Sequence, residues 1–274
     1  MDRRSFLKTF SAAAASITAP HSFAAEAVAS SKRGCCFSAR DESWLERVQK
    51  LSPSWMYTWG LDRPTELPAE IEFAPMLWGE MKAENRAQAL AGVAKRFRSG
   101  EVRHLMSFNE PDQKKQGNMT VERVVELWPE LMAVGVPLVS PGCVHPDRDW
   151  MRAFMKQVDA RNLRVDAVAV HSYGGPGVES LVRKLTQVHE EFGRPLWITE
   201  FAVGDWEATT PEGNRHSPAR VAAFMREVLP ALDELPFLER YAWFSASPSS
   251  APLGTSALFT EDNQLTALGE IYQQ

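Results

Sequence analysis

Two glutamates in the chain each follow a short apolar segment that reads as a β-strand. Glu110 lies within residues 103–112 (RHLMSFNEPD), directly before Pro111, and Glu200 follows the apolar residues 195–199 (PLWIT). A proline cannot extend a central β-ladder, so the first strand must stop at its carboxylate. Cleavage of a glycosidic bond requires two carboxyl groups, one to protonate the leaving oxygen and one to act at the anomeric carbon. Glu110 and Glu200 are therefore candidate catalytic residues if the fold brings them together.

The separation of two such carboxyl groups decides the stereochemistry of hydrolysis. At about 5 Å the second carboxylate is a nucleophile and the configuration is retained, whereas a wider gap admits a water molecule and inverts it. A salt bridge or a solvated loop charge is the ordinary alternative for any glutamate at a strand end. Glu200 follows an apolar strand, where an unpaired charge would be costly, and Asn109 beside Glu110 can donate its amide to a sugar hydroxyl. Both observations favour the catalytic interpretation.

Alternating apolar and amphipathic segments must position these glutamates. Eight apolar segments read as strands, and they cover residues 34–39, 55–60, 73–79, 103–112, 137–143, 165–173, 195–201 and 238–246. Most are followed by a segment whose apolar residues recur at helical spacing. Thr120 and the pair Ser217–Pro218 provide helix starts, and Gly193 provides a helix end. Residues 61–72 are polar and contain two prolines, so we expect a loop there.

This alternation predicts an α/β fold with a parallel sheet. Eight strand–helix units in residues 28–274 match a single-domain (β/α)₈ TIM barrel. The rival is a doubly wound open sheet, but no Gly-x-Gly-x-x-Gly follows the first strand. In a barrel the active site lies at the C-terminal ends of the strands. Glu110 on the fourth strand and Glu200 on the seventh would then face each other across the barrel mouth.

Four motifs resemble a known group of enzymes. Residues 109–112 (NEPD) with 199–201 (TEF) resemble the clan A retaining glycoside hydrolases. Together with residues 73–79 (FAPMLWG), 170–173 (VHSY) and 241–244 (YAWF), they are similar to glycoside hydrolase family 128 over roughly residues 33–273. That family contains endo- and exo-acting β-1,3-glucanases. The resemblance therefore implies a polysaccharide or oligosaccharide substrate with β-1,3-glucan linkages, cleaved by double displacement without a cofactor.

The same resemblance implies roles for individual residues. Glu110 would be the acid/base and Glu200 the nucleophile, while Asn109 would contact the sugar 2-hydroxyl. His171 and Tyr173, at the end of the sixth strand, would orient the nucleophile. A satisfied core histidine is the alternative for His171.

Four tryptophans are candidate sugar-binding residues by the same resemblance. Trp243 would be a stacking platform under the sugar at the cleavage point. Trp59 and Trp78 would flank the glycone side, and Trp206 would wall the groove. Packing in the core or at the rim is the alternative for these side chains.

Composition excludes several other classes. The formal net charge of −5 argues against nucleic acid as a partner. After the N-terminus no segment approaches eighteen continuous apolar residues, so we expect no membrane partner. We also expect the protein to be a monomer. None of the six histidines lies in a His-x-His or His-Glu-x-x-His motif, so no metal is predicted. Cys35, Cys36 and Cys143 read as buried thiols, with a disulfide from Cys143 as the alternative.

Residues 1–27 read as an export signal. Arg3 and Arg4 precede an alanine-rich, mildly apolar run, and small residues near position 25 provide a cleavage site. The pattern resembles a twin-arginine signal, so we expect the mature protein in the periplasm or outside the cell. Two alternatives to a β-1,3-glucanase stay open: a clan A glycanase for another β-glycan, and a barrel that binds glucan without cleaving it.

Overall fold

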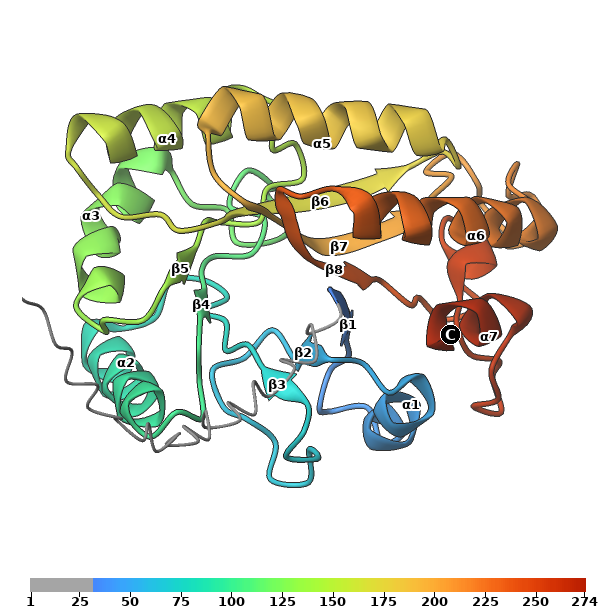
Figure 1. The fold of residues 1–274 in the computed structure, drawn as a ribbon, viewed down its shortest axis with the longest axis horizontal. Helices are drawn as coiled ribbons and strands as arrows, with labels where there is room; N and C mark the ends of the chain where they lie inside the picture. The colour runs from blue at the N-terminus through green and yellow to red at the C-terminus, as the bar shows by residue number, and fades with distance from the viewer. Residues whose placement is uncertain (1–31) are drawn as a thin grey trace, which may run out of the picture. The chain divides into compact units, whose positions relative to one another are not determined.

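Eight parallel strands lie at the centre of the computed structural model, which describes residues 32–274 (Figure 1). One sheet has the strand order β3-β2-β1-β8-β7-β6 and a second contains β4 and β5. The strands are β1 (Arg33–Cys36), β2 (Trp55–Tyr57), β3 (Glu72–Phe73), β4 (Leu105–Met106), β5 (Leu138–Val139), β6 (Val168–Gly174), β7 (Leu196–Val203) and β8 (Leu238–Trp243). The predicted α/β fold with parallel strands is confirmed. The hydrogen-bonded ladders form two separate sheets. The predicted export signal, residues 1–27, lies outside the described residues.

Helices follow most of the strands and lie on their outer side (Figure 1). They are α1 (Trp44–Leu51), α2 (Ala83–Arg98), α3 (Val121–Met132), α4 (Asp149–Ala160), α5 (Val178–Phe192), α6 (Pro218–Glu234) and α7 (Ala267–Gln273), with a short 3₁₀ helix η1 (Gly254–Ser256). No helix lies between β2 and β3, as the polar segment 61–72 predicted. Within residues 32–274, none of the helices has both the length and the apolar character needed to cross a bilayer.

The helix boundaries follow from local chemistry. The side chain of Thr120 accepts a hydrogen bond from the backbone N–H of Arg123, and that of Ser217 accepts one from Arg220. Each satisfies a donor that would otherwise be free in the first turn. Gly193 ends α5 with a φ of 60°, a left-handed conformation that glycine adopts at little cost. These three predicted helix ends are confirmed.

Isolated bridges connect the two sheets. Met76 pairs with Met106, and Val139 pairs with Ala167, so contacts run from the segment after β3 to β4 and from β5 toward β6. The predicted strands 103–112 and 137–143 are longer than the ladders observed. Asn109 and Gly142 form only one further bridge before the chain turns at Glu110.

Two clusters of buried side chains stabilise the fold. The larger lies between strands and helices, and it includes Tyr241 and Trp243 of β8. The smaller draws on all eight strands or on residues close to their ends: Cys36, Trp55, Tyr57, Ala74, Met76, Met106, Val139, Ala167, Ala169, Trp197 and Ala242. Side chains alternate between the two faces of a strand, so the smaller cluster belongs to the inner face. All three cysteines are buried and unpaired, as expected.

An ionic cluster lies beside this inner cluster. The guanidinium of Arg240 lies over the rings of Trp197 and Trp55, and its Nη2 donates to both carboxylate oxygens of Glu72 at 2.9 and 2.8 Å. The Nδ1 atom of His104 lies 3.4 Å from Glu72. Glu72 begins β3 and His104 precedes β4, so the cluster joins the starts of several strands.

Candidate active site

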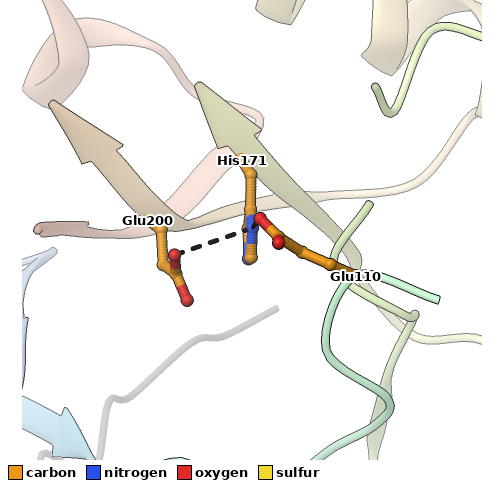
Figure 2. Close-up of side chains that lie close together, drawn as sticks. All are labelled: Glu110, His171 and Glu200. Atoms are coloured by element: carbon orange, nitrogen blue, oxygen red, sulfur yellow. Dashed lines mark hydrogen bonds and ion pairs between the residues drawn. The ribbon is translucent and has the colours of Figure 1, made fainter. Parts of the chain in front are cut away.

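Glu110 and Glu200 meet at the C-terminal ends of the strands, as the strand count predicted. Figure 2 shows the three side chains gathered at one place: Glu110 from the loop after β4, His171 from β6 and Glu200 from β7. One oxygen of each carboxylate and one ring nitrogen of His171 all lie within 4.8 Å of one another. Two carboxyl groups this close match the spacing of a nucleophile and an acid/base better than the wider gap that admits a water molecule.

The backbone at Glu110 holds a strained conformation. Its φ is 42°, in the left-handed region that a residue with a Cβ rarely adopts. The N–H of Glu110 donates to the carbonyl oxygen of Gly142 at 2.7 Å, and the N–H of Asn109 donates to that of Trp78 at 2.8 Å. These bonds to both neighbouring segments hold the turn in place. This backbone conformation therefore directs the Glu110 side chain into the site.

An irregularity in β7 aims Glu200. Trp197 belongs to the inner cluster, while Ile198 and Phe201 both belong to the outer one. Strict alternation would direct Glu200 outward, but the pairing of β7 shifts register at this point: Val170 pairs with Ile198 and His171 pairs with Glu200. Thr199 is thus an extra residue, as in a β-bulge, and the side chain after it turns into the site.

Glu200 is buried, with 5% of its surface exposed, and its carboxylate accepts several hydrogen bonds. Its Oε1 accepts from the hydroxyl of Tyr57 at 3.0 Å and from the indole N–H of Trp59 at 2.8 Å. Its Oε2 accepts from the hydroxyl of Tyr173. All three hydrogen-bond partners are donors, which suits a carboxylate that accepts at both oxygens. The predicted contact of Tyr173 with Glu200 is present.

His171 is fully buried between the two glutamates. Its Nδ1 lies 2.9 Å from Oε1 of Glu110 and 3.7 Å from Oε2 of Glu200, so it is closer to the predicted acid/base than to the predicted nucleophile. Burial alone would lower the pKa of His171, but the nearby charges of Glu200 and Glu110 outweigh it and raise that pKa. A Cβ at Gly142 would lie 2.7 Å from the other ring nitrogen, so only glycine leaves room for the ring here.

Glu110, His171 and Glu200 are also arranged as a potential metal site within the described residues. Their ligand atoms are already engaged: Nδ1 of His171 contacts Glu110, and both oxygens of Glu200 accept hydrogen bonds. A metal ion would have to displace these donors. The arrangement as it stands suits proton transfer, and the prediction of no metal stays a prediction.

Three aromatic side chains stand where a sugar chain could contact them. Trp78 is 39% exposed and Trp206 is 63% exposed. Both line the cleft that contains the two glutamates, and so does Phe244, which directly follows β8. The indole N–H of Trp206 donates to the carbonyl oxygen of Tyr173 at 3.2 Å, which fixes its orientation. The cleft has a volume of about 1090 Å³, above the usual range for small-molecule pockets. It therefore has room for an extended ligand.

The prediction for Trp243 is wrong. Its side chain is 0% exposed, its indole N–H donates to the carbonyl oxygen of Ser256, and its ring packs edge-on against Phe201. The small Ala242 takes the inner face of β8, so Trp243 faces the helices. The cleft is instead lined by Phe244, the next residue.

The sequence did not predict that Tyr57 belongs to the site, or that Trp59 bonds directly to Glu200. Trp59 was expected to flank the sugar, and it lines the cleft while bonding directly to Glu200. Its φ of 56° marks a second strained residue at the site. Tyr57 lies two residues before Trp59 and two after Trp55, so period-two alternation along β2 was a signal for its inward position. Asp112 has a structural role, since its carboxylate accepts from the N–H groups of Val144 and His145.

Comparison with known proteins shows what this chain is similar to. A family model described as "Glycosyl hydrolase catalytic core" matches residues 34–272. Alkali-sensitive linkage protein 1 of Schizosaccharomyces pombe is 27% identical over 256 residues, covering 89% of this chain and 44% of that protein. The chain thus spans less than half the length of this curated relative.

Solved structures of family 128 enzymes share the fold. A subgroup I endo-β-1,3-glucanase from Amycolatopsis mediterranei, in complex with laminarihexaose, is 32% identical with a TM-score of 0.74, covering 89% of this chain and 98% of that one. A subgroup II endo-β-1,3-glucanase from Pseudomonas viridiflava is 26% identical with a TM-score of 0.70 and the same coverage. A subgroup VI exo-β-1,3-glucanase from Aureobasidium namibiae is 20% identical with a TM-score of 0.71, covers 90% of this chain and 97% of that one, and shows likeness of fold alone.

Proposed function

Because the chain belongs to the glycosyl hydrolase catalytic core family, we propose that it is a retaining β-1,3-glucanase with Glu110 as acid/base and Glu200 as nucleophile. The observation that carries the proposal is the meeting of two carboxylates within 4.8 Å in a cleft bordered by exposed tryptophans. The choice of glucan rests on the family 128 relatives, two of which are endo-β-1,3-glucanases more than a quarter identical to this chain.

The partners of the two carboxylates support the division of roles. Glu200 accepts hydrogen bonds from Tyr57, Trp59 and Tyr173, which keep a negative charge in place for attack on the anomeric carbon. Among the described residues, the one side-chain hydrogen bond of Glu110 is with His171, through Oε1. Its other oxygen is free to carry a proton toward the leaving group.

The reaction then proceeds in two displacements. Glu200 attacks the anomeric carbon while Glu110 gives its proton to the departing glycosidic oxygen, which leaves a glycosyl ester on Glu200. Glu110, now ionised, takes a proton from a water molecule, and that water hydrolyses the ester. Two inversions at one carbon retain the β configuration. Asn109 lies beside Glu110 and lines the cleft, which supports the expected contact of its side chain with a sugar hydroxyl.

We also infer that the two sheets close into one (β/α)₈ barrel. The bridges between Met76 and Met106 and between Val139 and Ala167 support closure, because each joins a strand of the smaller sheet to the chain next to an edge strand of the larger sheet. The inner cluster supports it too, since a closed barrel fills its interior with side chains from every strand. Export through a twin-arginine signal in residues 1–27 stays a proposal from the sequence alone.

Substitution of the two glutamates tests the function. We expect Glu110→Gln and Glu200→Gln each to reduce release of reducing sugar from laminarin by on the order of a thousandfold or more. Glu190, exposed on α5, provides a matched control, and Glu190→Gln should keep full activity. Near wild-type hydrolysis by both active-site variants would refute the proposal.

Two alternatives make different predictions. A clan A enzyme for another β-glycan would cleave β-1,4-linked oligosaccharides or mannans in preference to laminarin. A barrel that only binds glucan would show laminarin affinity with no sugar released by the wild type.

A further inference from the structure

A second hollow adjoins the catalytic cleft. It has a volume of about 660 Å³, and Trp59 and Trp78 line both spaces. Its walls are residues 60–62 after β2, residues 76–81 after β3, and one face of α2. We call this hollow the α2 groove. Trp59 and Trp78 therefore stand at the boundary between the catalytic cleft and the groove.

The face of α2 that borders the groove carries small side chains in its second half. Asn85, Gln88, Ala89 and Gly92 recur at the spacing of one helix face. Gly92 lies inside the helix, where glycine is among the least favourable residues. A Cβ at Gly92 would meet no atom within 4 Å, and its φ is not in the left-handed region. Neither packing nor backbone conformation requires this glycine, but an open groove does.

Both loop walls are tied to α2. Arg86, buried near the start of α2, donates to the carbonyl oxygen of Met81 at 2.7 Å and pairs with Glu130 of α3 through two hydrogen bonds of 2.8 Å. Arg96, near the end of α2, donates to the carbonyl oxygen of Leu61 at 2.6 Å. The groove is thus held open before any ligand arrives, which lowers the cost of binding.

The lining chemistry suits an uncharged, hydroxyl-rich chain. Asp62 and Glu80 supply carboxylates and Asn85 and Gln88 supply amides, while the described lining contains no lysine, arginine or histidine. Carboxylates accept hydrogen bonds from hydroxyl groups, and amides both donate and accept. Asp62 and Glu80 pair with Arg96 and Arg123, which do not line the groove, so the lining offers no unpaired positive charge to an anion. The exposed indole of Trp78 adds a flat apolar surface at the junction of the two spaces.

We propose that the α2 groove binds further sugar units of the same neutral glucan chain that is cleaved between Glu110 and Glu200. This inference rests on the proposed function and adds a preference for chain length. A chain that passes Trp78 gains contacts with α2, whereas a short oligosaccharide fills only the catalytic cleft. The enzyme therefore favours long chains over short ones.

A substitution that fills the groove tests the proposal. Gly92→Leu places a side chain in the open space, and Ala91→Leu places the same side chain on the neighbouring exposed position of α2, which does not line the groove. Both replacements suit a helix, so thermal unfolding should show no loss of stability in either variant. For Gly92→Leu we expect kcat/KM on laminarihexaose to fall about tenfold while kcat/KM on laminaritriose changes less than about twofold, because one set of sugar contacts is lost. Ala91→Leu should match the wild type on both substrates.

The outcomes separate the groove from the proposed function. The deciding quantity is kcat/KM on laminarihexaose divided by kcat/KM on laminaritriose. If this ratio is the same in wild type and in Gly92→Leu, the groove proposal is overturned and the proposed hydrolysis is unaffected. If the wild type hydrolyses neither oligosaccharide, the proposed function fails, and calorimetric titration with laminarihexaose then tests the groove alone. Binding about tenfold weaker in Gly92→Leu than in Ala91→Leu supports the groove, and equal binding overturns it.

Discussion

Removal of one hydroxyl group beside Glu200 provides a quantitative test of the site. Tyr173 on β6 donates its hydroxyl to Oε2 of Glu200. Burial, followed by the charge of Glu200, raises the pKa of Tyr173, so the hydroxyl stays protonated across the working pH range. Tyr173→Phe removes this donor and keeps the ring, which packs edge-on against Trp206 and Phe244.

The expected loss follows from the partners of each carboxylate oxygen. A hydrogen bond to a charged group contributes about 1.5–3 kcal/mol, which corresponds to roughly 10- to 150-fold in rate. The other contact of Oε2 is His171 at 3.7 Å, beyond ordinary hydrogen-bond length, so no second donor replaces the lost one. Oε1 accepts from both Tyr57 and Trp59. Tyr57→Phe should therefore cost less than Tyr173→Phe.

The assay compares kcat/KM on laminarihexaose for the two variants and for Tyr241→Phe. Tyr241 is a matched control, because its buried hydroxyl donates to the carboxylate of Asp233 at 3.1 Å and it does not line the cleft. We expect Tyr241→Phe to keep wild-type activity. A loss of less than about threefold for Tyr173→Phe, or a larger loss for Tyr57→Phe, would refute the account of how Glu200 is held.

Three further predictions concern the site and the fold that supports it. Gly142→Ala should lower kcat by about tenfold or more with little change in KM, because the new Cβ would lie 2.7 Å from Nε2 of His171 and push the ring from Glu110; an unchanged kcat would contradict this. Burial raises the pKa of Glu72, but hydrogen bonds from His104 and Arg240 outweigh it and hold that pKa at about 2. Its contribution to stability is thus present above the unfolded-state pKa and lost as pH falls toward 2, so thermal unfolding should show a steeper acid loss in wild type than in Glu72→Gln. Extended dialysis against EDTA should leave laminarin hydrolysis unchanged, and loss restored by a divalent ion would show that Glu110, His171 and Glu200 hold a metal.

Local signals in the sequence predicted helix ends and the order of elements well. Thr120, Ser217 and Gly193 act within one turn of their own helix, so their effect does not depend on distant parts of the chain. The meeting of Glu110 and Glu200 followed from strand order, because the ends of parallel strands gather at one side of a sheet. These features needed no knowledge of side-chain packing.

Side-chain direction was harder to predict. One extra residue in β7 turns Glu200 into the cleft, and no composition signal marks Thr199 as that residue. In β8 the choice between Trp243 and Phe244 depended on which face Ala242 occupies, and a tryptophan fits either a core or a sugar-binding surface. The role of Tyr57 depended on a partner 143 positions away in the chain, which no local pattern reveals.

The configuration of the first sugar released tests the central claim most directly. Proton NMR of laminarihexaose hydrolysis, recorded before the product anomers equilibrate, distinguishes the two stereochemical outcomes. Carboxylates within 4.8 Å predict double displacement, so the β-anomer of the new reducing end should appear first. Initial appearance of the α-anomer would show inversion and would contradict the assignment of Glu200 as nucleophile.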